Sequence, residues 1–287
     1  MNSSNNSSLL CFFGHHKCGT QWIQGILREL CQDMGLKYGH AFNAQIFDCD
    51  LETFITHKRI EVFSYTNANY QYVKNLRNFR GFHVIRDPRD IVVSAYFSHL
   101  YSHPTDQNTK LEEEKEILQG LSKDEGLFQE IKFNYDVFKA MYEWNYSLEN
   151  VIEIKMEDIM RNPYSVFVDI FRFLGIVSES RPKFNERWSY LLALTALRSQ
   201  QLLLKKTLLQ FRLKTIPYER ILGIVYENEF AKKSRGRKPG QENTTSHYRK
   251  GVAGDWQNHF TQEHIDFFKS QYNDLLIKLG YEQDDNW

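Results

Sequence analysis

A lysine, a glycine and a threonine lie close together in the segment His16-Lys17-Cys18-Gly19-Thr20-Gln21-Trp22. The apolar run from Leu9 to Phe13 precedes this segment, and apolar residues at helical spacing follow it. A turn from a buried strand into a helix directs backbone N–H groups toward one point, which favours binding of an anion. Lys17 adds a positive charge and Thr20 a hydroxyl, so the sequence predicts a site for a phosphate or sulfate ester.

The order of residues in this loop differs from that of the common nucleotide-hydrolase loop, G-x-x-x-x-G-K-[ST]. Here Lys17 stands two residues before Gly19 instead of directly after a glycine. This order disfavours an ATP or GTP hydrolase. On this segment alone, the alternative is a plain strand–helix turn with a surface lysine.

A second cationic segment, Arg86-Asp87-Pro88-Arg89-Asp90, directly follows the short apolar run Gly81 to Ile85. Pro88 suits the first turn of a helix. Arg86 can bind a phosphate through two parallel hydrogen bonds, and Ser94 lies two helical turns further on. The alternative is a set of ion pairs at the start of the helix.

The third segment, Tyr248 to Trp256, combines two cations, two glycines and two aromatic residues in nine positions. Arg249, Lys250 and the open backbone at Gly251 could hold a doubly charged phosphate. A basic surface loop that binds anions without specificity is the alternative.

The remaining patterns predict the elements that position these segments. Strands are expected at Leu9–Phe13, Ile60–Tyr65, Gly81–Ile85 and Val151–Ile154, and helices at Thr20–Met34, from Pro88, at Phe128–Leu148, Tyr164–Leu174 and Thr261–Leu279. A continuous apolar strand such as the first is typical of a sheet covered on both faces. Strands that alternate with helices predict an α/β fold with a parallel sheet.

Together the three segments resemble the cytosolic-type sulfotransferases, which use 3′-phosphoadenosine 5′-phosphosulfate (PAPS). The family's first motif, Pro-Lys-x-Gly-Thr-Thr-Trp, is similar to His16–Trp22. Its second, Arg-Asn-Pro-x-Asp followed by a serine, is similar to Arg86–Asp90 with Ser94, and its third, Arg-Lys-Gly-x-x-Gly-Asp-Trp, is matched throughout by Arg249–Trp256. The resemblance spans roughly residues 9–279 and implies a P-loop-like three-layer fold with a central parallel β-sheet flanked by helices.

The resemblance also implies a set of nucleotide-binding residues. PAPS as donor and 3′-phosphoadenosine 5′-phosphate (PAP) as product would be held, without a metal, by Lys17, Cys18, Gly19, Thr20, Gln21, Trp22, Arg86, Ser94, Phe230, Arg249, Lys250 and Gly251. The chain departs from the family pattern in several places: His16 replaces proline, Gln21 replaces the second threonine, and Met156 stands where the family often has tyrosine.

For catalysis, the resemblance implies that Lys17 neutralises the charge that develops on the leaving oxygen. Many family members place a histidine about two dozen residues before the second motif, but residues 63–69 contain none. We take His16 as the candidate base because it adjoins Lys17. His15, His99 and His103 are the alternatives.

Composition restricts the class of protein. The 287 residues include 36 Lys+Arg and 36 Asp+Glu, so the net charge is zero, which argues against a nucleic-acid partner. The four cysteines are spaced unlike a zinc or redox motif, and no signal or membrane segment is evident. We therefore expect a cytoplasmic protein, either monomer or homodimer, with a disordered polar tail at 1–8, a single domain at 9–287, and a possible helical lid over the acceptor at 185–230.

The leading hypothesis is a sulfotransferase that transfers the sulfuryl group of PAPS to a hydroxyl or amine of a small molecule, such as a natural product, phenol, lipid or sugar. A Mg-dependent nucleotide kinase or NTPase with an atypical phosphate loop is one alternative. A nucleotide-binding protein without catalytic activity is another.

Overall fold

A parallel sheet of five strands forms the centre of the computed structural model, which describes residues 8–103, 109–178 and 212–287. Its strands are β1 (Leu9–Gly14), β2 (Tyr38–Ala41), β3 (Val62–Tyr65), β4 (Phe79–Ile85) and β5 (Val151–Lys155), in the spatial order β2-β3-β1-β4-β5. All neighbouring pairs are parallel. The predicted α/β fold with a central parallel sheet is confirmed.

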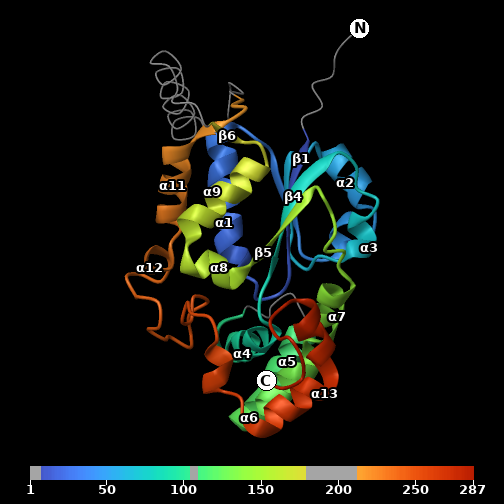
Figure 1. Ribbon diagram of the computed structural model, residues 1–287, viewed down its shortest axis with the longest axis vertical. Coiled ribbons are helices and arrows are strands. Elements are labelled where there is room, and N and C mark those ends of the chain that lie inside the picture. The colour runs from blue at the N-terminus through green and yellow to red at the C-terminus, as the bar shows by residue number, and fades with distance from the viewer. Residues whose placement is uncertain (1–7, 104–108, 179–211) are drawn as a thin grey trace.

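Helices cover the sheet. They are α1 (Thr20–Met34), α2 (Leu51–Lys58), α3 (Tyr70–Val73), α4 (Pro88–Phe97), α5 (Thr109–Gln119), α6 (Lys123–Phe133), α7 (Tyr135–Glu143), α8 (Met156–Arg161), α9 (Pro163–Phe173), α11 (Tyr218–Glu227), α12 (Phe230–Lys233) and α13 (Gln262–Lys278), with shorter turns η1 (Ala44–Phe47), η2 (Ser98–Ser102) and η3 (Asp255–Asn258). Helices α1, α9 and α11 lie on one side of the sheet and α2 and α3 on the other, while α4–α6 and α13 gather below it (Figure 1). A short parallel pair, β6 (Val177–Ser178) and β7 (Ile216–Pro217), lies apart from the main sheet.

Strand β1 shows why its sequence is apolar without alternation. Phe12 packs into the core beneath α1 and α9, whereas Phe13 packs into a second core beneath α2 and α3. Both rings are fully buried. Because successive side chains of a strand point to opposite faces, a strand covered on both faces has no polar side.

The sheet order places two strand ends side by side. The chain leaves β1 toward β2 on one side, whereas β4 pairs with β1 on the other side. Ligands of open parallel sheets bind at such a reversal, outside the carboxyl ends of the strands. The loop containing Lys17 follows β1, and Arg86 follows β4, so this geometry brings both cations to one edge.

Two helix boundaries illustrate the accuracy of the sequence patterns. The last helix is confirmed, with Thr261 as its N-cap residue. The helix predicted over 128–148 is wrong in detail, since α6 ends at Phe133 and α7 begins at Tyr135. At the break, the side-chain amide of Asn134 donates to the Glu130 carbonyl oxygen at 2.8 Å. Of the predicted lid, residues 185–211 lie outside the described part, as do residues 1–7 of the predicted tail.

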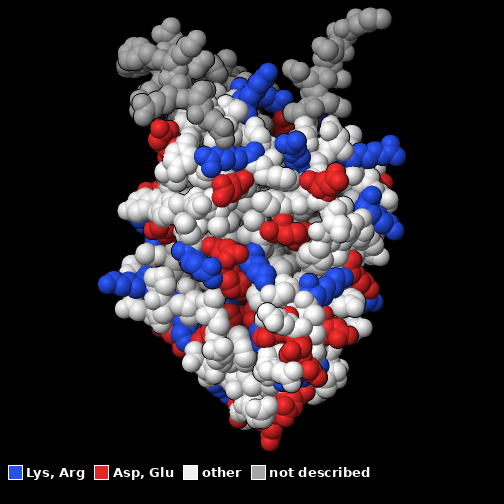
Figure 2. Space-filling model, viewed as in Figure 1, with Lys and Arg blue, Asp and Glu red and all other residues white. Residues whose placement is uncertain are grey.

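The outer surface mixes both signs of charge. Lysine and arginine side chains alternate with aspartate and glutamate over the face drawn in Figure 2. Within the described ranges, no helix has the length and apolar character to cross a membrane. All four cysteines are free thiols, and only Cys49 is exposed.

Arg89 anchors the C-terminal segment to the start of α4. The guanidinium is buried and pairs with Asp87 at 2.7 Å and Glu282 at 2.6 Å. It is also held between the rings of Trp256 and Trp287, at 4.1 and 4.4 Å from their centroids. This one side chain therefore joins the second motif, the third motif and the end of the chain.

Replacing Arg89 by Met should lower the free energy of unfolding by about 3 kcal/mol, because the variant leaves two carboxylates without their cation. Urea denaturation followed by circular dichroism measures the change. Lys139→Met is the control, since Lys139 makes an exposed pair with Glu143 at 3.9 Å and its loss should cost less than about 0.5 kcal/mol. Equal costs for the two variants would contradict the role of Arg89 as an anchor.

Candidate functional site

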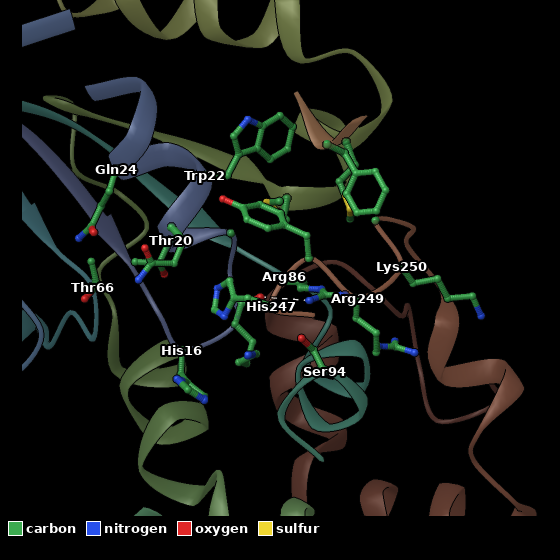
Figure 3. A pocket seen from close by; sticks show the side chains of 18 of the residues that line it. His16, Thr20, Trp22, Gln24, Thr66, Arg86, Ser94, His247, Arg249 and Lys250 are labelled. Carbon is green, nitrogen blue, oxygen red and sulfur yellow. Dashed lines mark hydrogen bonds between the residues drawn. The ribbon is translucent and has the colours of Figure 1, made fainter. Parts of the chain in front are cut away.

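One cavity of about 1380 Å³ lies at the carboxyl edge of the sheet and is lined by all three cationic segments. It is larger than most small-molecule sites, which span roughly 300–1,000 Å³. Of the predicted site residues it is lined by His16, Lys17, Gly19, Thr20, Gln21, Trp22, Arg86, Ser94, Phe230, Arg249, Lys250 and Gly251. In Figure 3, Thr20 and Trp22 come from α1, Ser94 from α4, and Arg249 and Lys250 from the C-terminal loop.

Cys18 is the exception and corrects the sequence interpretation. Its side chain is fully buried and is absent from the lining of the cavity. The Cys18 backbone N–H donates to the carbonyl oxygen of His15 at 3.2 Å. Cys18 therefore shapes the loop from inside.

The loop after β1 has a left-handed backbone at two positions, Lys17 (φ 63°) and Gly19 (φ 71°). The turn leads directly into α1, so the helix N-terminus faces the cavity edge where Thr20 lies. Burial and the charge of Arg86, followed by that of Arg249, lower the pKa of Lys17 to about 7, against the opposing effect of Glu130. A lysine in this state gains strongly from an anion placed beside it.

Arg86 links the first and second segments. One terminal nitrogen donates to the Lys17 carbonyl oxygen at 3.1 Å, and the other lies 3.7 Å from Asp90. The Nε atom is buried and has no hydrogen-bond partner among the described residues. Buried donors are almost always paired, so this atom points to a missing acceptor.

Asp90 brings the third segment to the second. Its carboxylate accepts hydrogen bonds from the backbone N–H groups of Gly254 at 2.8 Å and Trp256 at 2.9 Å. Burial raises the pKa of Asp90, and Arg86 and these bonds oppose that shift. In the sequence, Asp90 indicated only a local ion pair and a match to the second motif. Its contact with residues more than 160 positions away had no local signal.

Asp255 holds the two cations of the third segment. It pairs with Arg249 and with Lys250, the latter at 2.5 Å. Burial opposes ionisation, but the nearby His259 ring, at 3.4 Å, and hydrogen bonds from Lys250 and Arg249 hold the pKa of Asp255 far below its usual value. Arg249 also pairs with Glu242 and packs over the Phe97 ring at 4.5 Å. Both cations are thus fixed in place at the cavity wall.

Two glycines allow close packing around the cavity. A Cβ on Gly251, which has φ 68°, would lie 2.6 Å from the ring of Phe230. A Cβ on Gly19 would lie 2.6 Å from the thioether of Met156, the residue that replaces the family tyrosine.

The Trp22 Nε1 donor is buried without a partner among the described residues.

Two neighbouring histidines start two similar chains of hydrogen bonds. His16 Nε2 lies 3.1 Å from His99 Nε2, and His99 Nδ1 lies 2.6 Å from Glu130. His15 Nε2 lies 2.8 Å from His83 Nε2, and His83 Nδ1 lies 2.6 Å from Glu153. Only the first chain reaches the cavity, through His16.

The first chain was only partly visible in the sequence. His99 was an alternative base, but its side chain is buried behind His16, and Glu130 was not considered. Burial, followed by Lys17, lowers the pKa of His99 to about 3, and burial raises the pKa of Glu130 to about 8. Burial also lowers the pKa of His16 well below its usual value, so all three groups favour their neutral forms.

The segment in which the family histidine was expected also reaches the cavity. Thr66 and Asn67 line it, and the Thr66 backbone N–H donates to the Ala41 carbonyl oxygen at 3.0 Å. His247, which the sequence analysis did not single out, lines it from the C-terminal loop (Figure 3). Of the alternative bases, His103 lines the cavity and His15 does not.

Comparison with known proteins identifies the family. A comparison with curated protein sequences gives no match. Among solved structures, mouse sulfotransferase SULT7A1 complexed with PAP is similar, with a TM-score of 0.56 and 16% identity over 93% of this chain and 84% of that one. Retinol dehydratase in complex with androsterone and the inactive cofactor PAP has a TM-score of 0.47 and 15% identity over 93% and 80%. The family model described as the sulfotransferase domain matches residues 10–280, and the chain therefore belongs to the sulfotransferase domain family.

Proposed function

We propose that this sulfotransferase uses PAPS as donor and transfers its sulfuryl group to a hydroxyl or amine of a small-molecule acceptor. The observation that carries the proposal is the meeting of Lys17, Arg86 and Arg249, from three distant segments, at one cavity. The buried Arg86 Nε and Trp22 Nε1 donors lack partners there among the described residues. A ligand with several phosphate oxygens supplies an acceptor for Arg86 and the negative charge that such a site lacks.

The residues present fit a nucleotide with phosphates at both ends of its ribose. Lys17, Thr20 and the start of α1 would hold the 5′-phosphosulfate. Arg86, Ser94, Arg249, Lys250 and Gly251 would hold the 3′-phosphate, with Trp22 and Phe230 beside the adenine. Bound PAPS supplies a sulfuryl group whose bond to a phosphate oxygen breaks as the bond to the acceptor forms.

The chain's own groups then have separate tasks. Lys17 stabilises negative charge that develops beside the loop, which is most effective in a buried site. His16 accepts the proton of the acceptor, since its low pKa leaves the ring neutral and able to take a proton. The lining of the cavity also includes Phe42, Asn67 and Phe133, a mixture of apolar and polar side chains that is suited to a small organic acceptor.

Further features of the proposal rest on the sequence. We place the protein in the cytoplasm, as one sulfotransferase domain over residues 9–287. The helical lid proposed for 185–230 would lie beside the acceptor. Natural products, phenols, lipids and sugars are all compatible acceptors.

PAP should stabilise the protein in the presence of EDTA, because cationic side chains suffice to bind its phosphates. At a concentration 100 times its Kd, PAP should add about 2.7 kcal/mol to the free energy of unfolding. A thermal-shift measurement with PAP in EDTA and with ATP plus Mg²⁺ tests this, and Arg249→Ala should lose most of the PAP effect. A larger shift with Mg-ATP than with PAP would instead favour a kinase or NTPase.

Affinity for PAP should fall as pH rises above 7. The pKa of Lys17 is about 7, and a phosphate bound beside it would raise that pKa, so binding takes up a proton wherever the free lysine is neutral. Between pH 7 and 9 the phosphates are fully charged, and Kd should weaken by up to about tenfold per pH unit. Titration calorimetry in two buffers measures the proton uptake, and Lys17→Met should abolish it.

Replacing His16 by Ala should lower kcat by roughly 10²- to 10³-fold and leave the affinity for PAP nearly unchanged. Transfer of radiolabelled sulfate to a panel of phenols, sterols and sugars measures the rate. Near-full turnover by the variant would remove His16 from this role. If PAP binds but the wild-type protein transfers sulfate to no acceptor, a nucleotide-binding protein without catalytic activity becomes the better description.

A further inference from the structure

Three elements supply the chain of groups behind His16. His16 lies in the loop after β1, His99 lies in η2 and Glu130 lies in α6. The links measure 3.1 Å between the two Nε2 atoms and 2.6 Å between His99 Nδ1 and Glu130 Oε1. His99 and Glu130 are buried, and the Asn134 side-chain amide donates to the second carboxylate oxygen at 3.0 Å. Each group in the chain is therefore held in one place.

The ionised state of Glu130 fixes every proton in this chain. A carboxylate can only accept, so His99 must carry its proton on Nδ1, and His99 Nε2 is then an acceptor. His16 must therefore donate from Nε2. Its other nitrogen, Nδ1, has no hydrogen-bond partner among the described residues and carries a lone pair. In this state a residue that lines the cavity is ready to accept a proton.

Protonated Glu130 reverses every donor in the chain. The carboxylic acid donates to His99 Nδ1, His99 donates from Nε2, and His16 accepts at Nε2 and carries its proton on Nδ1. Both histidines are neutral in both states. The second state holds one proton more than the first. The net result is that a proton is taken up at His16 Nδ1 and a proton is gained by Glu130.

We propose that His16, His99 and Glu130 act as one proton acceptor, in which His16 Nδ1 takes the proton of the acceptor hydroxyl and Glu130 stores it. The inference rests on the proposed function. The acceptor O–H bond breaks as the new O–S bond forms, and the electrons of the old S–O bond leave with PAP. His16 Nδ1 takes the proton of the acceptor, His16 Nε2 passes its own proton to His99 Nε2, and His99 Nδ1 passes its proton to Glu130. His99 and Glu130 are positioning residues, because neither touches the acceptor.

The surroundings of the chain favour this storage. Burial, then His99, Lys17 in the same loop, His103 directly after η2 and His247 in the C-terminal loop all lower the pKa of His16 and so disfavour an imidazolium there. Glu114 in α5 raises the pKa of His99, whereas Lys17 lowers it. Burial raises the pKa of Glu130 to about 8, with Asn134 and Lys17 opposing. The last carboxylate is thus the most favourable place in the chain for the proton.

The molecule contains its own control. The chain His15–His83–Glu153 has the same residue types and similar distances, and burial raises the pKa of Glu153 to about 8 as well. His15 is buried and does not line the cavity. Glu153→Gln therefore removes a comparable histidine–carboxylate pair without touching a group that can meet an acceptor.

Histidine tautomers test the proposal without measuring activity. In ¹⁵N spectra of the histidine-labelled full-length protein, His16, assigned with His16→Gln, should carry its proton on Nδ1 below about pH 8 and on Nε2 above it, with no imidazolium between pH 6.5 and 9.5. Glu130→Gln should abolish this switch, and Glu153→Gln should keep it. A single tautomer of wild-type His16 over the whole range would overturn the proposal.

The pH dependence of kcat is the second readout. For the wild type, kcat should rise with pH, with an apparent pKa near 8. Glu130→Gln should lower kcat about 10²-fold and lower the apparent pKa of this rise by more than one pH unit. Glu153→Gln should keep the wild-type apparent pKa. In His99→Gln, the glutamine can form hydrogen bonds to both neighbours but cannot pass a proton between them, so kcat should fall as in Glu130→Gln. This variant replaces Glu130→Gln if Glu130→Gln does not fold. A wild-type kcat and profile in Glu130→Gln would overturn the proposal.

The two readouts separate this inference from the proposed function. If PAP fails to bind, the function is wrong, but the tautomer switch still reports on the chain. If PAP binds and sulfate is transferred, an unchanged pH profile in Glu130→Gln contradicts the proton storage alone.

Discussion

A half-buried lysine that makes no ion pair among the described residues is the constraint on which this site depends. Lys17 lies at a cavity wall beside the charges of Arg86 and Arg249, and burial and these charges depress its pKa. Burying a charge is costly unless a partner compensates for it. Within the described residues Arg249 has Asp255 and Arg86 has Asp90, but Lys17 makes no ion pair. The site therefore carries an excess of positive charge, for which an anionic ligand compensates.

The rest of the fold keeps these cations together. Adjacent parallel strands bring Lys17 and Arg86 to one edge, because each follows the carboxyl end of its strand. The sheet does not carry the third segment, which instead depends on the Asp90 carboxylate and its two backbone donors. Asp90 thus has two functions, since it also faces the Arg86 guanidinium at 3.7 Å. Removing its charge would weaken both the docking of the loop and the orientation of the arginine.

Local patterns predicted what depends on neighbouring residues. The apolar run of β1, the helix from Thr20 to Met34 and the Thr261 cap follow from sequence alone, and all three are confirmed. The order of strands, the docking of Gly254 on Asp90 and the partners of His16 depend on contacts between residues far apart in the sequence, which leave no periodic signal. Cys18 was grouped with its neighbours by motif, and only the structure shows that its side chain points into the core.

The position of His16 next to Lys17 couples the proposed base to the charge that it must complement. Glu130 raises the pKa of Lys17, and Lys17 lowers the pKa of Glu130, so each stabilises the ionised form of the other. When Glu130 gains a proton, Lys17 loses this support. In the proposed reaction that happens as negative charge grows beside Lys17, so the lysine keeps a counter-charge throughout. A base at residues 63–69 would lack this link, which gives a physical reason for a histidine in the loop itself.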